Sequence, residues 1–313
     1  MRFLTLSDGM PAVASAATIG FFDGVHRGHQ FLIRQVMECA AMRGQASLLV
    51  TFRRHPRQVM HADYQPQLLS TFEEKCALLA ATGADYCATL DFTMDLAAMS
   101  ARQFMADILR DKLRVRTLVI GYDHRFGHDR AAGFADYVEY GHELGMEVVR
   151  AEPFSLGGVN VSSSVVRACL CDGEVAMAAR CLGYPYSLSG TVVEGFHEGH
   201  GLGYPTANLR PDDCCKLVPK GGVYAVKVRR RGGSGMATCA GMLNIGTRPT
   251  LGNGDNRSIE VYLLDFRGDL YGRQLTVDFI SRLRDEKKFR NKGELANQLR
   301  MDEAAVRELI YSH

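Results

Sequence analysis

The stretch that decides the fold of the first half of the chain is Val13–Met42, VASAATIGFFDGVHRGHQFLIRQVMECAAM. Small and apolar residues predict a buried strand at Val13–Gly20, and apolar residues at helical spacing predict a helix at His29–Met42. Between them lies GFFDGVHRGH, where Gly24 and Gly28 let the backbone approach a phosphate chain closely. A helix N-terminus also offers free N–H groups to such an anion. The stretch therefore predicts a strand–loop–helix unit that binds phosphate.

Strands and helices alternate along the rest of this half. Further strands are predicted at Ser47–Phe52, Tyr86–Leu90, Arg116–Ile120 and Glu147–Val149, and helices at Thr71–Leu79, Ala101–Leu109 and Gly133–Leu144. Thr71 followed by Glu74 is a capping box, which fixes the start of its helix. Because such alternation is typical of βαβ units, we expect a doubly wound parallel sheet with ligands at the carboxyl ends of its strands.

The pattern changes near residue 184. Short β runs follow at Ser187–Val193, Val223–Val228, Ala237–Leu243, Ile259–Leu264 and Leu275–Ile280, and helical spacing returns at Gly293–Tyr311. Short strands without intervening helices favour an antiparallel sandwich or small barrel. We therefore expect an α/β domain at residues 1–183 and a β domain with a terminal helix at residues 184–313.

Composition limits the class and the compartment. The 313 residues carry 37 Lys+Arg against 35 Asp+Glu, so no concentrated basic surface points to a nucleic-acid partner. The nine cysteines are odd in number and lack CxxC spacing, which favours free thiols in a reducing cytosol over disulfides or a zinc ribbon. No stretch approaches about 18 apolar residues, and the N-terminus lacks a signal-peptide core, so we expect a cytoplasmic protein without membrane contact.

Two histidines in the glycine-rich loop point to chemistry on a phosphate. His26 and His29 are three residues apart, so both can face one ligand. Paired imidazoles suit the stabilisation of charge on a phosphate where it is attacked. Two surface histidines in a glycine turn are the simpler alternative, and zinc binding lacks a third ligand nearby.

Two further segments carry groups that suit phosphate. In VSSSVVR, Ser162 or Ser163 can cap the helix that follows, and Arg167 lies one turn further on the same side. Hydroxyls, helix N–H groups and a guanidinium together suit triphosphate oxygens, and a capping role can coexist with that one. In GHGLGYPTANL, Thr206 and Asn208 alternate and face one side, as partners for Mg²⁺ and phosphate or as an ordinary strand edge.

These segments resemble the motifs of one family. Residues 20–29 are similar to the HxGH signature of nucleotidyltransferases and, in their surroundings, to the bifunctional bacterial riboflavin kinase/FAD synthetase (FMN adenylyltransferase) family, whose usual form is GxFDGVHxGH. GYDHRFGHDRAAG at 121–133 resembles its flavin-side loop, and VSSSVVR at 161–167 its ISSTxxR motif. GHGLGYPTANL at 199–209 resembles its GxLGFPTAN signature, and GVY, NIGTRPT, EVYLLDF, DLYG and LRDEKKF follow in the family's order.

For the first domain the resemblance implies a Rossmann-like HxGH nucleotidyltransferase fold. FMN would attack the α-phosphorus of ATP, giving FAD and pyrophosphate with the help of Mg²⁺. His26 and His29 would be catalytic, and Asp123 and Arg125 would lie on the flavin or metal side, where a loop salt bridge is the alternative. The residues implied for ATP and phosphate binding are Gly20, Phe22, Asp23, Gly28, Ser163, Ser164 and Arg167.

For the second domain the resemblance implies a six-stranded antiparallel riboflavin kinase barrel with a terminal helix. The ATP γ-phosphate would pass to the ribityl 5′-hydroxyl of riboflavin, giving FMN and ADP. Glu260 would be the base that this alcohol needs, with a carboxylate on an edge strand as the alternative. Gly203, Thr206 and Asn208 are implied for ATP, the last two also for Mg²⁺, and Arg284 and Glu286 for the flavin.

Some positions depart from the family pattern. Phe21 stands where Asn is common, Tyr122 and His124 replace an acidic residue and Phe, Ser164 replaces Thr, and His200 replaces Arg. A bifunctional enzyme is the leading hypothesis. The departures on the flavin side leave a kinase alone as a second hypothesis, and a flavin-sensing regulator without turnover as a third. Only small-molecule partners are expected, and a weak homo-oligomer is left open.

Overall fold

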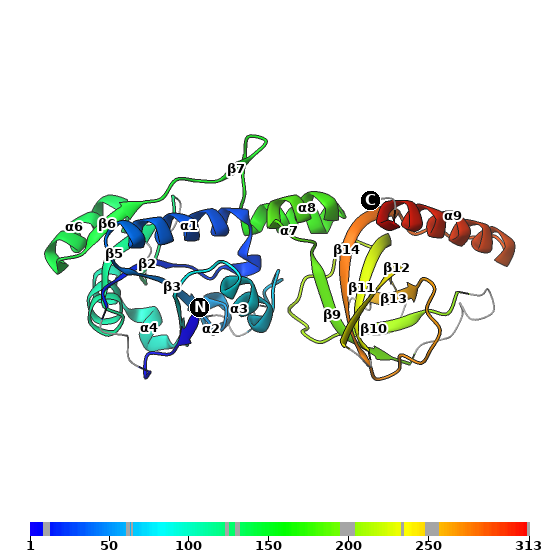
Figure 1. Cartoon of the computed structure of the whole chain (residues 1–313), viewed down its shortest axis with the longest axis horizontal. Coiled ribbons are helices and arrows are strands. Elements are labelled where there is room, and N and C mark those ends of the chain that lie inside the picture. Colours follow the sequence, from blue (N-terminus) through cyan, green and yellow to red (C-terminus); the bar gives the residue numbers. More distant parts are fainter. Residues whose placement is uncertain are drawn as a thin grey trace. The chain divides into compact units, whose positions relative to one another are not determined.

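The structure is a computed structural model in which the chain forms two compact units, Met1–Ser163 and Ser164–His313 (Figure 1). It describes residues 1–8, 13–60, 63, 65–122, 125–128, 132–194, 204–232, 235–247 and 257–311.

The first unit is built on a parallel sheet. Its strands are β1 (Arg2–Leu4), β2 (Ser15–Ile19), β3 (Ala46–Phe52), β4 (Tyr86–Leu90), β5 (Val115–Ile120) and β6 (Glu147–Arg150). They lie in the order β1-β4-β3-β2-β5-β6, and every neighbouring pair is parallel. From β2 the chain winds to β3 and β4 on one side and later to β5 and β6 on the other. This confirms the doubly wound sheet and places its switch point between β2 and β5, where ligands bind in such folds.

Helices and a short hairpin surround this sheet. They are η1 (Asp23–Val25), α1 (Arg27–Met42), α2 (Pro56–Met60), α3 (Phe72–Ala80), α4 (Met94–Ala98), α5 (Ala101–Gln103), η2 (Phe104–Lys112), α6 (Phe134–Leu144), β7 (Ser155–Leu156) and β8 (Val159–Asn160). The predicted capping box of α3 is present, since Thr71 and Glu74 bond each other's backbone N–H groups. The helix predicted at Ala101–Leu109 is confirmed and extends to Lys112, but only α5 is α-helical, and η2 is a π-helix. Its apolar positions fit either winding, so periodicity does not distinguish them.

Both faces of the sheet are covered by apolar cores. Leu48 and Val50 of β3 point into a core shared with η2 and α6. Leu49, between them, points to the other face, where it packs near Ile33 of α1 and Leu79 of α3. This burial on both faces explains why the strands of this unit read as continuous apolar runs.

The second unit is a closed barrel. After α7 (Ser163–Asp172) and α8 (Val175–Leu182) come β9 (Ser187–Val193), β10 (Ala207–Pro211), β11 (Gly222–Gly232), β12 (Gly235–Thr247), β13 (Arg257–Leu263) and β14 (Gln274–Arg284). The barrel order is β10-β13-β12-β11-β14-β9, with antiparallel neighbours throughout. The predicted six-stranded antiparallel barrel is thereby confirmed. Closure also means that β13, which carries Glu260, is no edge strand.

The terminal helix α9 (Lys292–Tyr311) packs on the outside of this barrel (Figure 1). Its Val306 is fully buried in a cluster with Ala225, Ala240 and Met242 of β11 and β12. α8 packs against β14 within the same unit. The chain therefore divides into compact units at residue 163, whereas the boundary between functional domains near residue 184 stays a prediction.

Two general expectations concern thiols and membranes. All nine cysteines are free. No helix in the described ranges combines the length and apolar character that crossing a bilayer requires.

Candidate active sites in the two units

The loop after β2 has an unusual backbone. Phe22, Gly24 and Val25 all have positive φ, at 54°, 71° and 34°. A β-branched residue with positive φ is a genuine outlier, and such conformations persist only where the surroundings enforce them. Here they do, because the side chains of Phe22 and Val25 are both 1% exposed. Strain held in this way is common at ligand sites.

Asp23 fastens this loop to the segment before α3. Its carboxylate accepts hydrogen bonds from the backbone N–H groups of Leu69 (3.0 Å) and Ser70 (3.1 Å) and lies against the Ser70 hydroxyl at 3.3 Å. The residue is only 3% exposed. Because this carboxylate faces inward and has the same charge sign as a phosphate, any part of Asp23 in phosphate binding would come through its backbone.

Lys75 is a second internal anchor, and sequence patterns did not reveal it. Its ammonium is buried and donates to the carbonyl oxygens of Phe21 (3.1 Å) and Phe52 (2.8 Å), which follow β2 and end β3. It also lies 3.9 Å from the centre of the Phe21 ring. Burial lowers the pKa of Lys75 to about 8, an effect that the nearby Asp23 carboxylate partly offsets.

The two histidines of the loop lie together. The rings of His26 and His29 stack with centres 3.6 Å apart and planes 20° apart. The His29 N–H donates to Nδ1 of His26 at 3.3 Å, so His26 caps the N-terminus of α1. The rings of Phe22 and His29 form a T-shaped pair, with their centres 5.2 Å apart. The structure thus brings both predicted catalytic imidazoles to one helix N-terminus at the carboxyl end of β2.

Two glycines in this region are required by close contacts. A Cβ at Gly28 would lie 2.7 Å from the carbonyl oxygen of Val161, and one at Gly20 would lie 2.9 Å from the Phe22 ring. The Ser163 hydroxyl donates to the Asp23 carbonyl at 3.1 Å. Residues 161–163 therefore pack directly on residues 20–29, the histidine loop.

The remaining predicted residues of this site are less tightly defined. Ser164 is exposed and Arg167 half-buried in α7, and both belong to the second unit. Asp123 lies outside the described residues, as does His124. Arg125 is exposed, directly before Phe126, whose ring stacks on Tyr137 at 4.5 Å. Their predicted roles stay predictions.

The second unit contains a cavity of about 380 Å³ between the barrel, residues 284–289 and α9. Its walls combine apolar and aromatic side chains with several polar and charged ones. The lining side chains include Tyr204, Thr206, Met242, Leu243, Asn244, Glu260, Tyr262, Arg284, Glu286, Phe289, Leu295 and Leu299. Size and lining suit a flat aromatic ligand with a polar tail.

A second cavity, of about 550 Å³, also borders Thr206. It is lined by Val192, Pro205, Thr206, Ala207, Val261, Leu263 and residues 266–271. Thr206 therefore lines both cavities.

Glu260 lies in a row of polar residues across three strands. In the barrel register it stands opposite Asn208 of β10 and Asn244 of β12, so the three side chains share one face. The Thr206 hydroxyl donates to Glu260 at 3.4 Å. Hydroxyl, amide and carboxylate oxygens are the donors that Mg²⁺ prefers, so this set fits that ion. Gly203, predicted beside them, lies outside the described residues.

The two residues predicted near the flavin both line the first cavity. Arg284 also forms a two-pronged ion pair with Asp302 of α9, at 2.8 to 3.1 Å, and the Asp302 side chain is 5% exposed. Glu286 lies against Gly246, where a Cβ would approach its carboxylate to 2.6 Å. Arg284 thus has a structural partner that no motif indicated.

Sequence reasoning missed several wall residues. Tyr262 and Asn244 share the face of Glu260 by alternation and by register, so the first could have been found from the spacing in EVYLLDF. Tyr204 and Phe289 have no such signal, because only tertiary packing brings them to the cavity.

Comparison with known proteins agrees with this picture. The family model described as FAD synthetase matches residues 11–165, and the one described as riboflavin kinase matches residues 182–310. The two modules define a class of enzymes that make flavin nucleotides.

The curated relatives sharpen this class. Proteins named bifunctional riboflavin kinase/FMN adenylyltransferase from Escherichia coli K12 and Pseudomonas fluorescens are each 38% identical, over 96% and 94% of this chain and 94% and 92% of their own lengths. One from Listeria monocytogenes is 33% identical over 96% of this chain and 94% of its own length. The chain belongs to the bifunctional riboflavin kinase/FMN adenylyltransferase family.

A solved structure supports the fold. A Streptococcus pneumoniae protein described as a macrolide-efflux protein is 29% identical and superposes with a TM-score of 0.88, covering 98% of this chain and 99% of its own. The names of the curated relatives mention no such activity, and the likeness to this structure is one of fold.

Proposed function

We propose that each of the two units of this chain carries out one of the two reactions of the family. Riboflavin is phosphorylated to FMN in the second unit, and FMN is adenylylated to FAD by the loop of the first unit. ATP is the co-substrate of both reactions, with ADP released in the first and pyrophosphate in the second. The observation that carries this assignment is that Thr206, beside Glu260, lines two neighbouring cavities, one for each kinase substrate.

In the kinase reaction, riboflavin occupies the aromatic cavity and ATP the cavity beside residues 266–271. Glu260 takes the proton from the ribityl 5′-hydroxyl, because a neutral alcohol is a poor nucleophile. Thr206 and Asn208 hold the phosphates and, with Glu260 beside them, a Mg²⁺ ion, which would neutralise phosphate charge. Gly203 would also contact ATP. Arg284 and Glu286 border the flavin.

In the adenylyl transfer, the stacked His26 and His29 stabilise charge on the α-phosphate while the FMN phosphate attacks it. The N-terminus of α1 adds N–H groups and a favourable dipole. The close-packed Gly20 and Gly28 keep this backbone in place. Further phosphate contacts are assigned to Phe22 and Asp23 through their backbone and to Ser163, Ser164 and Arg167, and flavin contacts to Asp123 and Arg125.

Three broader expectations remain proposals. The domains divide near residue 184. The location is the cytoplasm, which the nine free thiols support. The partners are small molecules only, with a weak homo-oligomer left open.

Incubation with riboflavin and Mg²⁺-ATP tests the proposed function. Liquid chromatography of the flavins over time should show FMN rising first and FAD following it, since the product of one unit is the substrate of the other. FMN that accumulates without FAD would limit the chain to the kinase reaction. No FMN at all would contradict the assignment of the two cavities.

A further inference from the structure

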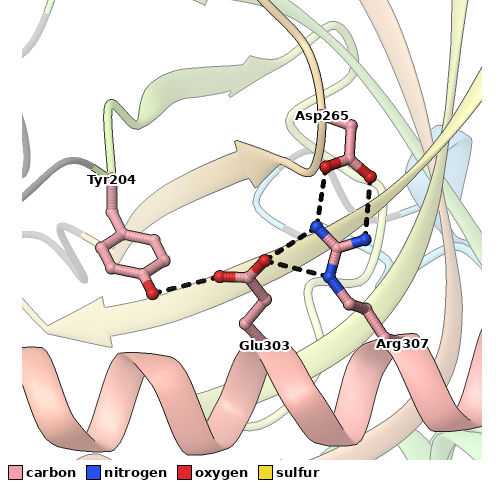
Figure 2. Close-up of polar contacts among 4 residues, drawn as sticks. All are labelled: Tyr204, Asp265, Glu303 and Arg307. Atoms are coloured by element: carbon pink, nitrogen blue, oxygen red, sulfur yellow. Dashed lines mark hydrogen bonds and ion pairs between the residues drawn. The ribbon is translucent and has the colours of Figure 1, made fainter.

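A chain of polar contacts on α9 links the surroundings of both kinase cavities (Figure 2). Glu303 accepts a hydrogen bond from the Tyr204 hydroxyl at 3.1 Å and two from the Arg307 guanidinium at 3.0 and 2.8 Å. The same guanidinium donates to both carboxylate oxygens of Asp265, at 2.9 and 2.7 Å. One turn of helix thus holds two segments that are some sixty residues apart in the sequence.

The Tyr204 end of this network lies at the riboflavin cavity. The Tyr204 ring lines that cavity and meets the ring of Tyr262 edge-on, with centres 5.0 Å apart. Tyr204 is also two residues before Thr206. Burial, and then the bond to Glu303, raises the pKa of Tyr204, so its hydroxyl stays a donor at neutral pH. Fixing this hydroxyl therefore fixes a cavity wall and the approach to the proposed phosphate-binding strand.

The Asp265 end lies at the nucleotide cavity. Asp265 has a positive φ of 58° and directly precedes residues 266–271, which line that cavity. The Arg230 guanidinium stacks over Phe266 at 4.6 Å and restrains the next residue of the segment. The Arg307 bridge thus holds the base of this segment in its left-handed conformation.

The network is not what attaches α9 to the barrel. The buried Val306 and the pair between Arg284 and Asp302 already do so. The side chains of Arg307 and Asp265 are 41% and 63% exposed, and ion pairs this exposed add little to stability. Substitutions of Arg307 or Asp265 should therefore change substrate binding without a large loss of stability.

We propose that Glu303 and Arg307 are positioning residues of the kinase reaction. Glu303 sets Tyr204 against the riboflavin cavity, and Arg307 sets Asp265 at the base of the nucleotide segment. Since Glu303 also holds Arg307, it acts on both cavities. This inference rests on the proposed kinase function of the second unit.

Four variants of the full chain test the proposal. Initial rates of FMN formation are measured over ranges of riboflavin and of ATP. Tyr204→Phe removes only the hydroxyl and should raise KM for riboflavin about 3- to 10-fold, the value of one hydrogen bond. Asp265→Asn keeps a residue that tolerates positive φ and should raise KM for ATP by a similar factor.

Glu303→Ala should raise both KM values. Glu308→Ala, an exposed glutamate on the same helix, is the matched control and should move neither. Formation of FAD from supplied FMN, which reports on the first unit, should equal the wild-type rate in all four.

The inference is overturned if Glu303→Ala leaves both KM values at the wild-type level, lowers kcat alone, or shifts KM no more than Glu308→Ala. It is also overturned if Tyr204→Phe does not raise KM for riboflavin more than KM for ATP, or if Asp265→Asn does not raise KM for ATP more than KM for riboflavin. A wild-type chain that forms no FMN would instead refute the proposed function, and this is seen before any variant is compared.

Discussion

Lys75 explains a departure of this sequence from its family at the level of a single residue. Phe21 replaces a common Asn, and its ring lies 3.9 Å from the buried Lys75 ammonium, a favourable cation–π distance. Asp23 of η1, Cys76 of α3 and Cys87 of β4 also act on this ammonium, and the centre of the Phe72 ring lies 5.5 Å from it. The substitution thus has a partner inside the protein, at the base of the histidine loop.

This environment gives a pH-dependent stability. The pKa of Lys75 is about 8 in the folded chain, because of burial, but returns to its ordinary value of 10.5 in the unfolded chain. Between these values the unfolded state binds more protons, so stability due to this group rises with pH. Relative to Lys75→Met, the wild-type free energy of unfolding should rise by at most about 1.4 kcal/mol per pH unit between pH 8 and 10.

Urea unfolding of both proteins at pH 7, 8, 9 and 10 measures this difference. Groups that do not contact Lys75 are common to both proteins and cancel in the difference. At pH 7 the lysine is largely protonated in both states, so the difference should change little below that pH. If the free energy of unfolding of the wild type, relative to Lys75→Met, stayed constant or fell between pH 8 and 10, Lys75 would not be buried as described.

Sequence spacing predicted which residues lie close together. It was less successful in predicting the direction of their side chains. His26 and His29 do lie together, and Thr206 does reach Glu260. Asp23 faces the protein interior, and Arg284 is held by Asp302 from another element. Side-chain direction depends on tertiary partners, which no local pattern contains.

The histidine loop is the element on which the proposed adenylyl transfer depends. Gly28 leaves no room for a side chain, because the nearest atom is a backbone carbonyl oxygen that cannot turn away. Gly28→Ala should therefore displace either the loop or residues 161–163. We expect FAD formation from FMN to fall at least about tenfold, as misplacement of about 1 Å can cost more than that.

The kinase reaction of the same preparation is the control for Gly28→Ala. FMN formation from riboflavin should stay at the wild-type rate, since the barrel is a separate unit. Wild-type FAD formation by this variant would mean that the loop tolerates the shift, and equal loss of both reactions would indicate misfolding.

Most elements were predictable, because their apolar runs are long. β4 and β9 have the predicted bounds, and α9 begins one residue earlier than expected. The short β1 and the β7–β8 hairpin were missed, since two or three residues carry no periodicity. The π-helical winding of η2 was missed because α and π turns bury similar apolar positions.

At the scale of the whole molecule, two units with separate cores serve consecutive reactions. The second unit makes FMN, and the first unit consumes it. On the proposed assignment the catalytic histidines belong to the first unit and Glu260 to the second, so neither reaction needs the catalytic groups of the other. The chain has 37 basic and 35 acidic residues. This balance agrees with single Lys and Arg side chains that each face a substrate phosphate or an acidic partner.

The most direct test of this division is a product analysis of two variants, His29→Ala and Glu260→Gln, each given riboflavin or FMN with Mg²⁺-ATP. His29→Ala should convert riboflavin to FMN and stop there. Glu260→Gln should leave riboflavin unchanged yet convert supplied FMN to FAD. If both reactions fell together in either variant, the assignment of one reaction to each unit would be wrong.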